Sequence, residues 1–166
     1  MSRRWTLDLF AYPLGSTGRR AFLALLVDDD SRLVVGFGMH RQLCAGRLQR
    51  VVRIALGRFG PPREILFDHG LHAVLRGKCG RSHLYQELEK HRIVPVWAKP
   101  NDALQLGKCE QVYDTLLREC DALEVAQDLD SARRGLRAFL HSYNERHRQR
   151  HEAAPTLATA PEVHDE

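Results

Sequence analysis

The 166-residue sequence lacks the features that would assign it to a membrane, secreted or repetitive class of protein. No apolar run approaches the roughly 20 residues that a membrane-spanning helix needs. The first ten residues, MSRRWTLDLF, contain neither a long apolar segment nor a small-residue cleavage site, so no signal peptide is expected. Internal repeats and low-complexity tracts are missing too. These absences predict one globular domain in the cytoplasm, with no membrane partner.

Cysteine is scarce and scattered. The four cysteines form no CxxC pair, which argues against a disulfide framework and indicates reduced thiols. His147 and His151 are four residues apart, but no cysteine or carboxylate pair joins them, so zinc binding there is a weak hypothesis. Zinc binding by Cys79 and His83 is a weaker hypothesis still.

Basic residues are plentiful. The formal net charge is +4 and the pI is near 9.1, with arginine far more common than lysine. This balance mildly favours a polyanionic partner such as nucleic acid. The hydrophobic fraction of 43% is ordinary for a globular protein.

Apolar periodicity predicts strands first, followed by an alternation of helices and strands. Strands are expected at 4–12, 20–28, 33–39, 64–67 and 92–98, and helices at about 48–59, 82–91, 108–120 and from Asp130, taken as an N-cap, to about 146. Pro95 should confine the last strand to a sheet edge. The acidic run 28–30 is expected to be a solvated turn, and the polar segment 99–107 a mobile loop.

Two aspartates stand at notable places in this pattern. Asp8 lies inside the first strand, and Asp68 directly follows the fourth. A helical crossover should place the fourth strand parallel to the first, so the two carboxylates should meet and raise each other's pKa. A divalent cation would remove that penalty, and carboxylate oxygens suit Mg²⁺ or Mn²⁺. Taken alone, Asp8 could instead be a solvent-facing strand residue, and Asp68-x-Gly70 could be simple turn chemistry.

A third acid is expected from the helix that follows the polar loop. Glu110 lies beside the apolar stripe of that helix and is the first candidate, with Asp114 as its competitor. Three such acids are the minimum needed to hold two metal ions for in-line phosphoryl transfer.

Five stretches together resemble one superfamily, and they cover nearly the whole chain. They are WTLDLF, LLVDDDSRLVVGF, PREILFDHG, LGKCEQVYDTLLRE and FLHSYNERHRQRH…TAPEV. In this order they resemble the catalytic core of the integrases and transposases that use an Asp, Asp, Glu triad, especially bacterial insertion-sequence transposases and retroviral integrases. The sequence departs from that pattern at His69, where asparagine is usual, and at Leu106.

The resemblance implies an α/β, ribonuclease H-like fold, with a five-stranded mixed sheet flanked by helices over residues 1–150 and a polar tail at 151–166. It implies that Asp8, Asp68 and Glu110 are catalytic and bind two Mg²⁺ or Mn²⁺ ions when DNA is bound. The implied activity is metal-dependent DNA strand cleavage and strand transfer, as in transposition, DNA integration and recombination. The implied partners are mobile-element ends, target DNA and other copies of the chain, joined as a homodimer or higher oligomer through the last two helices.

Basic side chains near the predicted loop and on the last helix are candidates for contact with DNA phosphates. They are Lys99, Lys108, Arg133 and Arg137. Two alternatives remain open at this stage. A ribonuclease H or junction nuclease would need an acid on the first helix, and residues 43–56 contain none. A non-catalytic DNA-binding or dimerising remnant of a transposase is the other.

Overall fold

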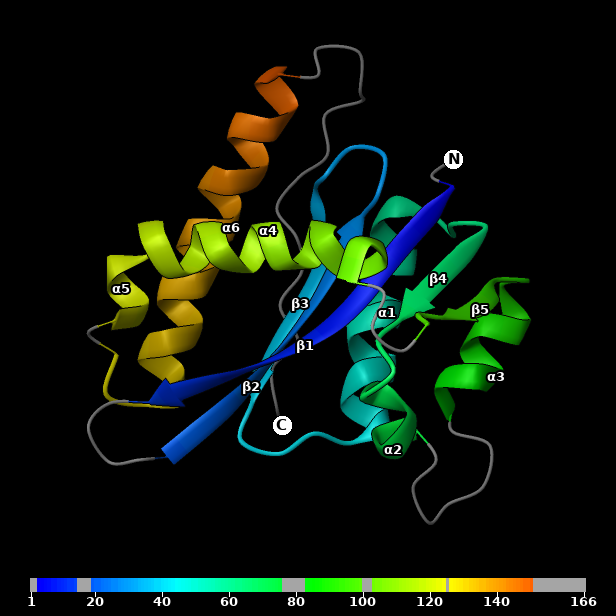
Figure 1. Cartoon of the computed structure of the whole chain (residues 1–166), viewed down its shortest axis with the longest axis horizontal. Coiled ribbons are helices and arrows are strands. Elements are labelled where there is room, and N and C mark those ends of the chain that lie inside the picture. The colour runs from blue at the N-terminus through cyan, green and yellow to red at the C-terminus, as the bar shows by residue number, and fades with distance from the viewer. Residues whose placement is uncertain (1–2, 15–18, 76–82, 100–102, 125, 151–166) are drawn as a thin grey trace.

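A computed structural model describes residues 3–14, 19–75, 83–99, 103–124 and 126–150 (Figure 1). Its centre is a five-stranded sheet in the order β3-β2-β1-β4-β5. The strands are β1 (Arg4–Leu14), β2 (Arg19–Asp28), β3 (Val34–His40), β4 (Glu64–Phe67) and β5 (Val94–Trp97). The first three pair antiparallel, whereas β4 is parallel to both β1 and β5. The predicted α/β fold with a mixed sheet is confirmed, and Pro95 lies on an edge strand as expected.

Helices cover both faces of the sheet (Figure 1). They are α1 (Ala45–Phe59), α2 (Leu71–Leu75), α3 (His83–Lys90), α4 (Ala103–Glu119), α5 (Asp121–Glu124) and α6 (Leu129–Arg150). Alternation along β1 divides the core: Trp5 and Leu7 pack with α1 and α3, while Tyr12 and Leu14 pack with α4 and α6. No helix among the described residues is long and apolar enough to cross a membrane.

The crossover helix α1 packs closely on the edge strand β3. Its buried stripe follows the helical period, and Gly60 ends the helix with a φ of 75° that favours glycine. A Cβ added at Gly36 or Gly38 would lie 3.1 or 3.0 Å from the Val51 side chain. Glycine at these two positions therefore lets α1 come close to the sheet and cover it.

Helix α4 begins earlier than the sequence analysis predicted. The loop expected at 99–107 is wrong over 103–107, which are helical; residues 100–102 lie outside the described residues. Gly107 lies inside this helix, because one glycine costs a helix only about 1 kcal/mol. The helix formers Ala103, Leu104 and Gln105 outweigh that cost. Glu110 therefore lies about two turns into α4.

Helix α6 differs from its prediction at both ends. Its cap is Asp128 and not Asp130: Ser131 donates its backbone N–H to Asp128 Oδ1 at 2.8 Å, and Asp128 donates its own to Ser131 Oγ at 3.3 Å. This reciprocal pair satisfies donors at the start of the helix. The helix also continues past Arg146 to Arg150. The predicted tail at 151–166 lies outside the described residues.

Asn144 of α6 completes the hydrogen bonding of edge strand β3. Its Nδ2 donates to the Val34 carbonyl oxygen at 2.9 Å, and the Val34 N–H donates to its Oδ1, also at 2.9 Å. Asn144 is only 1% exposed, so water cannot replace these bonds. The side chain thus ties the last helix to β3 across 110 residues of sequence.

Asn144→Ala is expected to lower the free energy of unfolding by about 2–4 kcal/mol, because two buried backbone groups of Val34 lose their partners. Urea unfolding curves measure this loss. Ser142→Ala, at an exposed position of the same helix, is the matched control and should change stability by no more than about 0.5 kcal/mol. Equal midpoints for the two variants would show that Asn144 does not hold β3.

Candidate active site

Asp8 and Asp68 lie at neighbouring positions in the centre of the sheet. The parallel register pairs Leu7 with Phe67, and Asp68 donates its N–H to the Leu7 carbonyl oxygen at 3.3 Å. The ladder therefore extends one residue past β4, and Asp8 faces Asp68 as the next pair. Paired residues project to the same side of a sheet. For Asp8 that is the side of Tyr12 and Leu14, which is covered by α4 and α6.

Asp8 is a buried carboxylic acid, 6% exposed. Its Oδ1 accepts the backbone N–H of Leu9 at 2.7 Å. The pKa of Asp8 is raised to about 7, mainly by burial and to a smaller extent by the carboxylates of Asp68 and Glu110, while the hydrogen bond from Leu9 opposes the shift. The solvent-facing alternative for Asp8 is wrong. The three acids proposed from the sequence act on one another electrostatically.

Asp68 combines turn chemistry with a position beside Asp8. Its Oδ2 accepts the Gly70 N–H at 2.9 Å, which is the bond expected of a turn aspartate. A Cβ added at Gly70 would lie 2.8 Å from the same oxygen, so glycine leaves room for the carboxylate. The turn and the charged site are thus compatible, because the turn fixes the direction of the side chain.

Glu110 is exposed on α4, next to a cysteine that anchors the helix. Cys109 is fully buried, and its Sγ donates to the Thr6 carbonyl oxygen at 3.4 Å, two residues before Asp8 on β1. Burial and then the nearby carboxylates hold the pKa of this thiol well above its usual range, so it remains a neutral donor. Its packing brings the α4 segment that carries Glu110 against β1.

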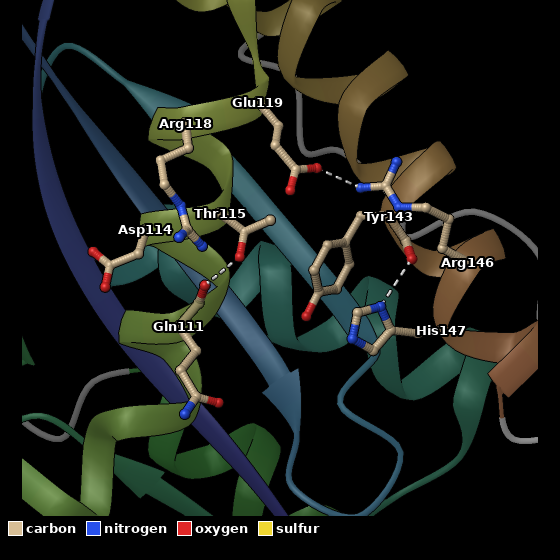
Figure 2. Close-up of a pocket in the computed structure, with 8 residues that line it drawn as sticks. All are labelled: Gln111, Asp114, Thr115, Arg118, Glu119, Tyr143, Arg146 and His147. Atoms are coloured by element: carbon tan, nitrogen blue, oxygen red, sulfur yellow. Dashed lines mark hydrogen bonds and ion pairs between the residues drawn. The ribbon is translucent and has the colours of Figure 1, made fainter.

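Asp114, the competing candidate, faces a different part of the surface. It lines a cavity of about 370 Å³ between α4 and α6, together with Arg118, Tyr143 and His147 (Figure 2). At the rim of this cavity, Arg146 pairs with Glu119 at 2.9 Å. Asp8, Asp68 and Glu110 do not line the cavity. The charges that raise the pKa of Asp8 include Glu110 and not Asp114, which favours Glu110 as the third acid.

Two sequence predictions about charged residues are wrong, at Asp29 and at Arg133, and the DNA contact expected of Lys108 stays a prediction. Asp29 is not part of a solvated turn: it is 9% exposed and accepts the Thr6 hydroxyl at 2.7 Å. Lys108, expected to contact DNA, pairs with the Asp29 carboxylate at 3.2 Å. Arg133, also expected to contact DNA, is buried and donates its Nε–H to the Met39 carbonyl oxygen at 3.0 Å. The other two candidates for DNA contact, Lys99 and Arg137, are exposed.

A row of rings begins beside Asp68 and was not anticipated from the sequence. The Phe67 and Trp97 rings lie 5.4 Å apart, Trp97 and His72 4.2 Å, and His72 and His69 5.8 Å. The row runs from the core at Phe67 to the exposed His69. A spacing of three residues between two histidines was the only local signal for it.

The carboxylates fit a divalent cation in donor type and charge. Hard oxygens come from β1, from the end of β4 and from α4, and the buried negative charge of Asp8 would be offset by a cation. Within the described ranges, however, no three His, Cys, Asp or Glu side chains form a ready-made metal cluster. The zinc hypotheses at His151 and Cys79 fall outside the described residues.

No sequence-family model matches the chain, and a comparison with curated proteins finds no match. Solved structures do match. The catalytic core domain of BIV integrase has a TM-score of 0.64 at 14% identity over 96% of this chain and 91% of that one. The HTLV-2 integrase catalytic core domain in complex with magnesium, in a trimeric form, has a TM-score of 0.59 at 14% identity over 81% and 82%.

A third match is an integrase assembly. The chain from a simian T-cell lymphotropic virus intasome has a TM-score of 0.70 at 14% identity over 98% of this chain. The present chain spans 58% of that longer chain. Together, these matches show that the chain has the ribonuclease H-like fold of retroviral integrase catalytic cores.

The raised pKa of Asp8 predicts a pH-dependent stability difference. The folded state holds a proton on Asp8 that the unfolded chain releases near pH 3.8, so wild type should lose stability as the pH rises from about 4 to 7. The full effect is roughly 4 kcal/mol. Asp8→Asn has no such carboxyl group, so its free energy of unfolding should rise relative to that of wild type over the same pH range. Urea unfolding without metal at several pH values measures this difference. The exposed Asp114→Asn is the control, and a pH-independent difference for Asp8→Asn would contradict the assignment.

Proposed function

We propose that this chain is the catalytic core of a DNA transposase or integrase, with Asp8, Asp68 and Glu110 as its catalytic, metal-binding carboxylates. The observation that carries the proposal is the register that places Asp8 beside Asp68 at the centre of an integrase-like fold, with the α4 segment that carries Glu110 packed against β1. A buried acid with two other carboxylates near it is unfavourable for folding, which is typical of a functional site. The reaction class is cleavage of a DNA phosphodiester, followed by attack of the freed 3′ hydroxyl on target DNA.

Mg²⁺ or Mn²⁺ would be held by the three carboxylates. Two such ions, when bound, supply activation of the attacking oxygen and stabilisation of the leaving one. Asp8, whose pKa both other acids raise, would serve both ions, while Asp68 and Glu110 would serve one each. The turn bond from Gly70 holds Asp68 in place, and the exposed Glu110 is free to turn inward. The HTLV-2 neighbour was solved with magnesium, which supports this choice of ion.

DNA is the proposed partner. The exposed Lys99, which follows β5, and the exposed Arg137 on α6 would contact phosphates. The outermost ring of the row beside Asp68, His69, offers a planar surface on which an unpaired base could stack. Self-association is proposed as well, since the neighbours include a trimeric core and an intasome.

The ribonuclease H alternative remains disfavoured, because α1 carries no acidic residue in its first turn or beyond it. A non-catalytic remnant is the more serious alternative, because the described residues contain no ready-made metal cluster. A catalytic core would process a bound DNA end, whereas a non-catalytic remnant would bind the end without processing it.

Strand transfer of a preprocessed DNA end with Mn²⁺ should be catalysed by wild type. Asp8→Asn, Asp68→Asn and Glu110→Gln should each lower the rate on the order of 100-fold or more, because each removes a ligand used in the reaction. Asp114→Asn, on the same helix as Glu110, should stay within a few-fold of wild type. Wild type that binds the DNA end but forms no product would identify a remnant.

A melting experiment separates a metal ligand from a turn residue at Asp68. Asparagine keeps the acceptor for Gly70 and removes the charge beside Asp8, so metal-free Asp68→Asn should melt at or above the wild-type temperature. Mn²⁺ should raise the melting temperature of wild type more than that of the variant, by mass action on the folded state. A variant that melts lower, with an unchanged response to Mn²⁺, would leave Asp68 as a turn residue only.

A further inference from the structure

Asp29 lies where the chain leaves β2, and it joins the two elements that carry Asp8 and Glu110. Its neighbours in the acidic run act locally: Asp28 Oδ1 accepts the Asp30 N–H at 2.8 Å, and Asp30 is exposed. The Asp29 side chain is only 8% exposed and points into the protein. A buried carboxylate needs partners, and those of Asp29 come from distant parts of the chain.

Every polar group of Asp29 takes part in a contact. Its Oδ1 accepts the buried Thr6 hydroxyl at 2.7 Å. Its Oδ2 faces Lys108 Nζ at 3.2 Å, and the same Nζ donates to the Asp29 carbonyl oxygen at 3.1 Å. Its own N–H donates to the Arg4 carbonyl oxygen at 3.0 Å. These charge-assisted contacts are strong and direction-dependent, so they fix the geometry of the groups they join.

The two side-chain partners of Asp29, Thr6 and Lys108, lie close in sequence to Asp8 and Glu110. Thr6 lies two residues before Asp8 on β1, and therefore on the same face of the sheet. Lys108 lies two residues before Glu110 on α4. One carboxylate thus links β1 and α4 at equal sequence distances from the two acids.

Apolar packing alone would leave this helix free to shift along its axis. Val112 and Leu116 press α4 against the sheet, but such contacts are non-directional. The Asp29–Lys108 contact and the bond from Cys109 Sγ to the Thr6 carbonyl oxygen are directional, and they come just before Glu110. They set where along β1 the helix lies.

We propose that Asp29 is a positioning residue for the carboxylate site, which sets the placement of Glu110 relative to Asp8 by holding Lys108 and Thr6. It touches neither DNA nor metal. The inference rests on the proposed function of Asp8 and Glu110. It also gives Lys108 a structural role in place of the DNA contact expected from the sequence.

Binding of Mn²⁺ alone, measured by calorimetry on the whole folded chain, tests the inference without requiring activity. Asp29→Ala should weaken Mn²⁺ binding by about 10-fold or more, as is typical for loss of a group that orients metal ligands. Thr6→Val should weaken it in the same direction, whereas Thr6→Ser keeps the hydroxyl and should restore wild-type binding. Asp29→Asn, which keeps the shape, provides a folded variant if Asp29→Ala does not fold.

Glu64→Gln is the matched control. It removes a different ion pair of β1, Arg4–Glu64 at 2.5 Å, which joins β4 and does not involve α4. At a temperature where all variants are folded, Glu64→Gln should bind Mn²⁺ as wild type does. If Asp29→Ala binds Mn²⁺ as well as Glu64→Gln, Asp29 has no positioning role, although the proposed function stands. If wild type itself does not bind Mn²⁺, the proposed function and the inference both fail.

Lys108→Met separates positioning from DNA contact. Loss of the contact between Lys108 and Asp29 should weaken Mn²⁺ binding and leave the salt dependence of DNA binding unchanged. Unchanged Mn²⁺ binding with a shallower salt dependence would overturn the inference and return Lys108 to the DNA interface.

Discussion

The parallel pairing of β1 with β4 is the constraint on which the rest of the structure depends. A parallel neighbour for β1 requires a crossover, and α1 supplies it by packing over glycines on β3. The same pairing continues to Asp68 through its bond to Leu7, so two acids face each other at the centre of the sheet. Helix α4 then covers that point and brings a third acid to it.

This arrangement opposes stability, since a buried acid next to two others is a poor element of a core. The chain compensates around the site. Leu9 and Gly70 donate backbone hydrogens to the two aspartates, and Asp29 with Thr6 and Lys108 fixes the helix above them. The polar groups around the three acids thus hold these side chains in place against their repulsion.

Much of the fold could be predicted because its signals are local. Alternation in β1, the apolar run of β2 and the turn residues after α1 identify those elements without reference to the rest of the chain. The wrong predictions concern residues whose burial depends on partners far away in the sequence. Within the acidic run 28–30, the sequence predicts that Asp29 is solvated, yet it is buried and contacts Lys108, 79 residues away. Arg133 reads as surface charge, yet Met39, 94 residues away, receives its Nε–H. No local pattern carries such information. The start of α4 differs from its prediction because the helix continues through Gly107.

The bonds between Asn144 and Val34 also limit how copies of the chain can meet. An edge strand with open N–H and C=O groups invites another strand to pair with it, which leads to sheet extension and aggregation. At β3 the Asn144 side chain occupies the N–H and C=O groups of Val34, and at the opposite edge Pro95 of β5 has no N–H to offer. Continuation of the sheet from one molecule into the next is therefore opposed at both borders. A contact between two copies through helices would leave the hydrogen bonds of the sheet intact.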